Sequence, residues 1–91
     1  MLRIITEQND GAFRLELHGS IAGEWIPILE RHWRGLQKTS PSAAVTVGVS
    51  NVMFIDSEGE RLLRRMAASG VRFEGEGCMN RYVIQRVSGG M

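Results

Sequence analysis

The segment Phe54-Ile55-Asp56-Ser57-Glu58-Gly59 holds the residues whose types and spacing come nearest to a chemical site in this chain. It brings a carboxylate, a hydroxyl and a second carboxylate to the start of an apolar run with helical spacing. A serine hydroxyl becomes a nucleophile only where a base or a metal ion activates it. No histidine or metal-ligand set lies beside this serine in the sequence. An enzyme built on Asp56, Ser57 and Cys78 is therefore the weakest interpretation of these residues.

The same segment also has a structural interpretation. Ser57 and Glu60 match the S-x-x-E capping box, in which the hydroxyl and the carboxylate each satisfy a backbone amide at a helix start. This pattern predicts that Ser57 caps the helix. It leaves Asp56 and Glu58 unexplained, unless their carboxylates only stabilise the helix, by about a few tenths of a kcal/mol each, through their interaction with its dipole.

The remaining candidate side chains are isolated. Cys78 precedes a predicted helix, where the dipole favours a thiolate, but no histidine lies near it in sequence, and we expect a small buried or half-buried hydrophobe. His18 and His32 have no Cys or His partner at metal-binding spacing, so we expect both on the solvated surface. We predict no metal site and no cofactor.

Two further patterns argue against phosphate binding. Arg61, Arg64 and Arg65 cluster on one predicted helix, but acidic residues share its turns, so a solvated helix face is expected. Gly75 and Gly77 stand between acidic residues, which repel phosphate, and no lysine follows them as in a phosphate-binding loop. We therefore expect neither nucleotide nor nucleic-acid binding.

The elements that must position these residues begin with two strands and a helix. Arg3–Thr6 and Ala12–His18 flank Asn9-Asp10-Gly11, a cluster that supplies the positive φ angles of a tight hairpin. Residues 19–23 are predicted to form a loop. Ile26, Leu29, Trp33 and Leu36 then recur at helical spacing, and because Pro27 is tolerated only in a first turn, the helix should begin near Glu24.

The rest of the chain alternates strands and helices. Residues 43–49 form a small apolar run typical of a strand buried on both faces, which Ser50 and Asn51 interrupt before residues 52–55 approach a loop. A helix follows, with Leu62, Leu63 and Met66 inward and Gly70 as its stop. Residues 71–73 are expected to form a short strand and residues 79–87 a last helix. The predicted order β-β-α-β-α-β-α gives an α/β fold, a mixed sheet of about four strands with helices mainly on one face.

Length and composition set the class of protein. The chain has 91 residues and 43% hydrophobic content, which suits one domain over residues 1–88 followed by a flexible end at residues 89–91. A net charge of +1 provides no strong field to attract nucleic acid or an anionic membrane. A single cysteine forms no intramolecular disulfide, so the cytoplasm is expected. The N-terminal residues resemble neither a signal peptide nor a membrane anchor.

The chain resembles the STAS domain of anti-sigma factor antagonists and sulfate-transporter tails over nearly its whole length. The similar pieces are listed in chain order: the strand Phe13–Leu17 with His18-Gly19-Ser20, the segment 45–55, the Asp56-Ser57-x-Gly59 turn, Leu62-Leu63 and the strand Gly70–Phe73. Of these, Phe54–Gly59 is the specific motif. The resemblance implies a non-catalytic domain that docks on a protein partner, often an anti-sigma factor with kinase activity, and whose docking is switched by phosphorylation of this loop.

Two departures make the chain resemble a short, degenerate member of that family. The family's phosphorylated Ser or Thr directly precedes the glycine, and here that position is Glu58. Gly48 stands where the family commonly has an acidic or amide side chain. A glutamate carries one charge where phosphoserine carries roughly −1.5 to −2 and three acceptor oxygens. Either the domain is held in a state like the phosphorylated one, or it uses the same face for constitutive binding.

The leading hypothesis is thus a bacterial signalling module, involved in regulation of transcription, that binds a protein partner such as an anti-sigma factor kinase. Its regulatory loop would be Asp56, Ser57, Glu58 and Gly59. The alternative is a small-ligand or nucleotide sensor of the same fold, which would need a glycine-rich or basic pocket. The sequence does not determine the oligomeric state.

Overall fold

The computed structural model describes residues 1–75, which form four strands and two helices. In chain order the elements are β1 (Leu2–Asn9), β2 (Ala12–Ile21), α1 (Trp25–Thr39), β3 (Val45–Ile55), α2 (Ser57–Ala68) and β4 (Arg72–Glu74). The predicted helix over residues 79–87 and the flexible end at 89–91 lie outside the described residues.

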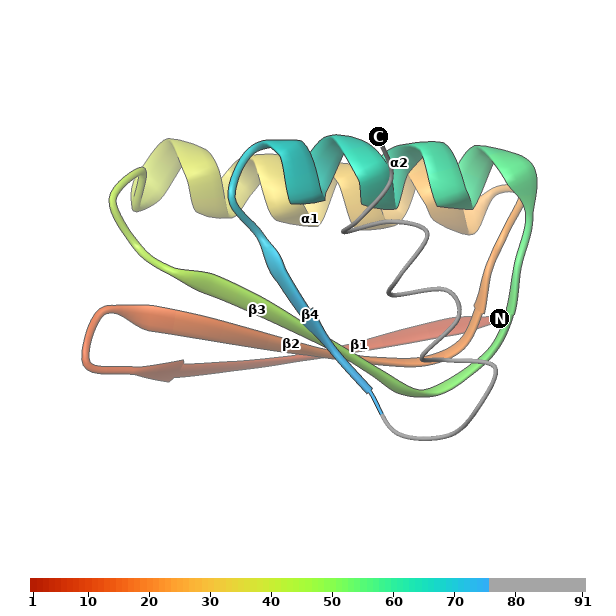
Figure 1. Cartoon of the computed structure of the whole chain (residues 1–91), viewed down its shortest axis with the longest axis horizontal. Coiled ribbons are helices and arrows are strands. Elements are labelled where there is room, and N and C mark those ends of the chain that lie inside the picture. The colour runs from red at the N-terminus through yellow and green to blue at the C-terminus, as the bar shows by residue number, and fades with distance from the viewer. Residues whose placement is uncertain (76–91) are drawn as a thin grey trace.

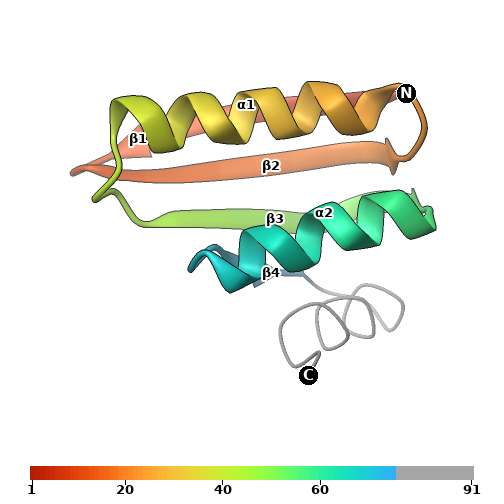
Figure 2. The same cartoon turned by 90° about the horizontal axis from the view of Figure 1, so that it is seen from above.

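The strands form one mixed sheet in the order β1-β2-β3-β4. β1 pairs antiparallel with β2, whereas β2, β3 and β4 run parallel. Both helices lie on one face of this sheet (Figure 1). Seen from above, α1 lies over the β1–β2 side and α2 over the β3–β4 side (Figure 2). The predicted α/β class and four-stranded mixed sheet are confirmed.

The core lies between the helix layer and the sheet. Leu15 and Leu17 of β2 are completely buried, and the alternating residues of the same strand face the other side. The other fully buried large side chains are Ile21, Leu29, Val47, Val49, Leu62, Leu63 and Met66. No polar or charged residue among residues 1–75 is buried, so hydrophobic burial holds the two layers together. Neither α1 nor α2 is long and apolar enough to cross a membrane.

Two turns follow their predicted chemistry. Asp10 and Gly11 have φ angles of 51° and 78°, the two consecutive positive values that a tight hairpin between β1 and β2 requires. Gly70 has a φ of 107° and ends α2. Its N–H donates to Ala67 O and that of Val71 to Met66 O, which is the Schellman arrangement of a helix C-terminus.

Three strands are longer than the sequence predicted, and the first of them, β1, spans Leu2–Asn9 instead of Arg3–Thr6. β2 continues through residues 19–21, which were expected to form a loop, and β3 runs unbroken through Ser50 and Asn51. The register between β2 and β3 shifts twice, between Glu16 and His18 and between Gly19 and Ser20. Each shift adds a residue to β3, as a β-bulge does. The polar residues thus mark a bulge within a strand, not its end.

Candidate functional site

The Asp56–Gly59 loop lies at the end of the molecule where β3 stops and α2 begins. β2 ends at the same place, and the backbone N–H of Asp56 donates to Ile21 O at 3.2 Å. Both helices begin at this end, which also carries the N-terminus (Figure 1). Parallel strands joined by crossover helices necessarily bring these strand ends and helix starts together.

Asp56, not Ser57, is the N-cap of α2. Its Oδ1 accepts a hydrogen bond from the N–H of Gly59 at 2.7 Å, and its Oδ2 accepts one from Gly23 N–H at 3.1 Å. The predicted capping box of Ser57 and Glu60 is therefore wrong, because the helix begins one residue earlier than that motif requires. The aspartate cap satisfies the orphan amide of Gly59, where the capping box would have satisfied that of Glu60, and it also ties α2 to the loop before α1.

Gly59 allows the first turn of α2 to approach the end of β2. The residue is buried, and a Cβ atom built on it would collide with the backbone carbonyl oxygen of Ile21. It would also lie 3.1 Å from Cγ2 of Ile55. Only glycine lets the helix start pack this closely against the sheet, so Gly59 positions the loop without offering a group to a ligand.

Ser57 and Glu58 are the two loop residues that face solvent. The Ser57 hydroxyl makes no hydrogen bond with any residue of the described chain. The Glu58 carboxylate is 64% exposed and forms an ion pair at 3.2 Å with Arg61, itself 75% exposed. Neither side chain caps the helix, since Asp56 already does so. The four predicted residues thus divide into two that hold the loop and two that it presents.

Exposed apolar side chains accompany the loop. Met53 and Phe54, just before it on β3, are 80% and 56% exposed, and Met1 is 84% exposed. Ser20 joins two of them, because its N–H donates to Met1 O and its Cα partner on β3 is Phe54. Large apolar side chains left in water at one end of a small domain are typical of an interaction surface. The sequence pattern of residues 52–55 predicts only a segment that approaches a loop and does not indicate this surface.

The arginines of α2 form ion pairs along its exposed side. Arg64 contacts Glu60 at 3.1 Å within the helix, and Arg65 reaches Glu30 of α1 at 3.2 Å. Hydrogen bonds from Arg65 and from Arg34 lower the pKa of the Glu30 carboxyl. The expected solvated, charge-paired helix face is present, and Glu30 additionally links the two helices.

A second charged cluster lies on the sheet face opposite the helices. Arg14 of β2 donates from Nε to Glu16 at 2.7 Å and from Nη1 to Glu74 of β4, also at 2.7 Å. These two hydrogen bonds raise the pKa of the Arg14 guanidinium. This cluster was not predictable from the sequence, because 60 residues separate Arg14 from Glu74 and only the sheet order brings them together.

Within residues 1–75, the structure gives little support to a metal site or a small-molecule site elsewhere in the molecule. His32 shares a 2.7 Å hydrogen bond with Thr6 of β1, and within residues 1–75 no three metal-ligating side chains come together. Hollows of about 90 and 270 Å³ lie away from the loop, below the roughly 300 Å³ at which small-molecule sites begin. Cys78 and Gly77 lie outside the described residues.

No model of a known protein family and no curated protein matches the sequence. Solved structures do match. An anti-sigma factor antagonist from Mycobacterium paratuberculosis superimposes with a TM-score of 0.76 at 22% identity, over 93% of this chain and 76% of that one. The STAS-like fold anticipated from the sequence is that of this neighbour.

Two other structures share the arrangement. One is Mglu, with a TM-score of 0.61 and 27% identity over 81% of this chain but only 19% of its own. The other, from Shewanella loihica PV-4, is an uncharacterized protein of the DUF3478 family with a SpoIIAA-like fold, with a TM-score of 0.51 and 13% identity over 89% of this chain and 72% of that one. These likenesses show the fold of the chain, which is STAS-like.

Proposed function

We propose that this protein is a regulatory module without catalytic activity that docks on a protein partner, an anti-sigma factor kinase or a related signalling protein. Its docking face would consist of Met53, Phe54, Ser57 and Glu58. The observation that carries the proposal is the outward presentation of Ser57 and Glu58 beside exposed apolar side chains, at a helix start that Asp56 already caps. The likeness in fold to an anti-sigma factor antagonist supports the class of partner.

The composition of this face suits a specific protein contact. Phe54 and Met53 offer apolar area to bury, and Glu58 offers a charge at its edge. A charged rim around apolar anchors is the usual anatomy of a protein interface. An arginine or backbone amides of the partner could replace Arg61 as the counter-group of Glu58.

Glu58 makes the docking constitutive in this proposal. It occupies the position that the STAS resemblance assigns to the phosphorylated residue, directly before Gly59. A carboxylate cannot be removed by a phosphatase, and its single charge matches phosphoserine only in part. Regulation would then come from the amount or state of the partner.

The absence of catalysis rests on Ser57. A serine nucleophile needs a base within hydrogen-bonding reach, and the Ser57 hydroxyl bonds to no described residue. We expect no phosphotransfer or ester hydrolysis above background from the purified protein. A turnover that disappears in Ser57→Ala would contradict this expectation.

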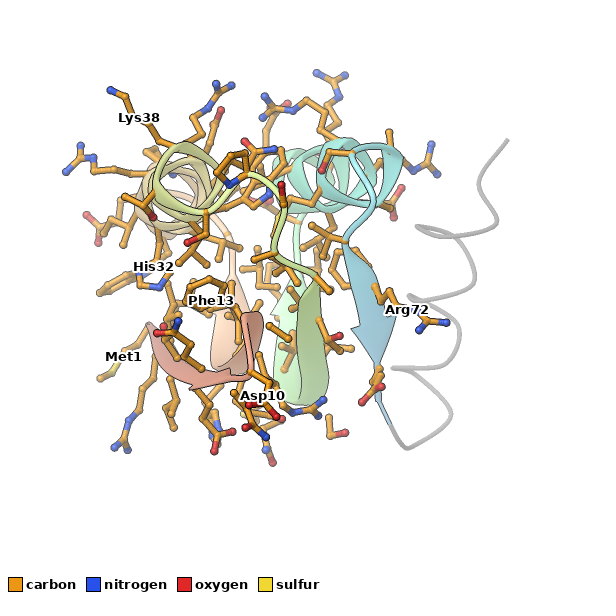
Figure 3. All side chains as sticks on the ribbon, turned by 90° about the vertical axis from the view of Figure 1, so that its left-hand side faces the viewer. Met1, Asp10, Phe13, His32, Lys38 and Arg72 are labelled. Atoms are coloured by element: carbon orange, nitrogen blue, oxygen red, sulfur yellow. The ribbon has the colours of Figure 1, made fainter. Side chains whose placement is uncertain are left out.

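The test is titration calorimetry of the purified protein with anti-sigma factor kinases from the same organism. Phe54→Ala should weaken binding at least tenfold if Phe54 is buried at the interface, the cost of a truncated aromatic anchor. Lys38→Ala serves as the control, because Lys38 lies near the end of α1, away from its start (Figure 3). An equal loss of affinity in both variants, or an affinity that Phe54→Ala leaves unchanged, would refute the proposed face.

A further inference from the structure

β1 is an edge strand whose outer side is unpaired within residues 1–75. It has 8 residues and stands first in the sheet order, with β2 as its neighbour. Figure 3 shows β1 at one border of the sheet, below α1. An edge strand presents a row of free N–H and C=O groups, which is a template for pairing with another strand.

The β1–β2 ladder determines which backbone groups point outward. The N–H of Ser20 donates to Met1 O at 2.8 Å, so Met1 and Ser20 form a hydrogen-bonded pair. Hydrogen-bonded and non-hydrogen-bonded pairs alternate in an antiparallel ladder. The odd-numbered residues of β1 therefore bond to β2. The residues that turn their backbone groups outward are Leu2, Ile4, Thr6 and Gln8.

The charges of β1 are arranged symmetrically about its middle. Arg3 and Glu7 lie two residues on either side of Ile5, and all three share the sheet face opposite the helices. Arg3 and Glu7 are exposed, and neither has an ion-pair partner in the described part of the chain. An antiparallel copy of this strand, centred on Ile5, would present the opposite charge to each of them.

We propose that the protein forms a symmetric dimer in which β1 pairs antiparallel with β1 of a second copy, on a two-fold axis at Ile5. Arg3 of each copy then lies opposite Glu7 of the other, which gives two ion pairs. Both occur in non-hydrogen-bonded pairs, where facing side chains are closest. Ile4 exchanges backbone hydrogen bonds with Thr6 of the second copy.

The charge pattern selects this register over its neighbours. Because only every second residue of β1 turns its backbone groups outward, the pairing can shift along the strand only in steps of two residues. Either shift sets Ile5 opposite a charged residue, Arg3 or Glu7, and removes both ion pairs. The centred register also aligns the whole of the strand from Leu2 to Gln8 with its copy.

The helix layer favours a second copy of this chain over an isolated peptide strand. Ile28 is 45% exposed and lies one turn before His32, the residue that bonds Thr6 of β1. The side of α1 that carries Ile28 and His32 therefore overlies the edge strand (Figure 3). In the dimer this side faces α1 of the second copy, whereas a lone strand would leave Ile28 in water.

The first test is sedimentation velocity over a concentration series. We expect the wild type to dimerise. Arg3→Glu and Glu7→Arg each set two like-charged pairs across the axis, so each should raise the dimer dissociation constant by about tenfold or more. The double variant restores opposite charges and should return to within about threefold of the wild type. A wild type that stays monomeric at its highest soluble concentration, or a double variant no better than the singles, would overturn the proposal.

A second pair of variants probes the backbone. Thr6→Pro removes an outward N–H but none of the bonds to β2, so it should give a folded monomer, which circular dichroism would verify. Thr6→Ala loses only the hydrogen bond to His32 and should remain dimeric. If Thr6→Pro folds and still dimerises, β1 is not the interface. If Thr6→Pro does not fold, the proposal is tested by the dissociation constants of the Arg3 and Glu7 variants alone.

Discussion

The carboxylate of Glu16 occupies the space that a side chain at Gly48 would need. The two residues are Cα partners on β2 and β3, and a Cβ atom at position 48 would lie 2.5 Å from Oε2 of Glu16. Arg14 holds that carboxylate in place from the side. The acidic or amide group that the STAS resemblance implies at position 48 is thus replaced by one supplied from the neighbouring strand.

Gly48→Asp should therefore destabilise the fold. The new carboxylate would lie between those of Glu16 and Glu74, the residues opposite position 48 on either side, with Arg14 as their shared counter-ion. Like charges directly opposite one another in a sheet cost up to about 1 kcal/mol. We expect Gly48→Asp to lose about that much more free energy of unfolding than Gly48→Asn, measured by urea denaturation. Equal values would show that only the added volume matters.

The cap of α2 gives a second stability prediction. Asp56→Ala removes the acceptor for both Gly59 N–H and Gly23 N–H and should lower the free energy of unfolding by about 1 to 2 kcal/mol. Ser57→Ala removes a hydroxyl that bonds to nothing in the described chain and should stay within about 0.5 kcal/mol of the wild type. Denaturation midpoints measure both, and a reversed order would restore Ser57 as the cap.

Periodicity and turn chemistry were sufficient to predict the type and order of the elements in residues 1–75, but not where β2 ends or that β3 continues through Ser50 and Asn51. The alternation around Leu15, the helical spacing around Leu29 and the Asp10-Gly11 turn all depend on neighbours close in sequence. Interactions between distant segments were not predictable in the same way. From the sequence alone, Gly48 indicates only that the acidic or amide side chain expected at this position is absent. The β2–β3 register is needed to show that the Glu16 carboxylate occupies that space.

The position of the candidate loop was predicted from the sequence, but the roles of its individual residues were not predicted correctly. A capping box and an aspartate cap differ by one residue in where the helix begins, and both fit Asp56-Ser57-Glu58-Gly59-Glu60. The need for glycine at position 59 could not be recognised without the position of Ile21, which precedes Gly59 by 38 residues in the chain. The tertiary arrangement, rather than the motif, separates the residues that hold the loop from those that it presents.

The link between the two helices should weaken in acid. Hydrogen bonds from Arg65 and Arg34 lower the pKa of Glu30 in the folded protein, so the unfolded chain takes up this proton first as the pH falls. The stability due to this ion pair is then complete above the ordinary pKa of a glutamate, about 4.3, and is lost as the pH falls below it towards the folded pKa. Thermal unfolding of wild type and Glu30→Gln should differ most at neutral pH and converge in acid. A difference that does not change with pH would contradict this account.

The fixed charge of Glu58 gives the prediction that bears most directly on function. Glu58→Ser restores the hydroxyl that the STAS resemblance implies at this position. The fold should hardly change, because the exposed ion pair of Glu58 with Arg61 contributes at most about 1 kcal/mol, and Asp56 remains as the cap. Unfolding curves of both proteins provide that control.

Binding should change far more than stability. If the carboxylate meets an arginine or backbone amides of the partner, Glu58→Ser should weaken binding to an anti-sigma factor kinase by about 1 to 3 kcal/mol, the range for charge-assisted hydrogen bonds. Glu58→Gln separates the charge from the shape of the side chain and should show most of the same loss. The opposite sign has a distinct meaning: tighter binding by Glu58→Ser, with phosphorylation of the new hydroxyl by the kinase, would show that Glu58 holds the domain in an unbound state. Equal affinities of all three proteins would remove Glu58 from the interface and leave it as a charge that only favours the start of α2.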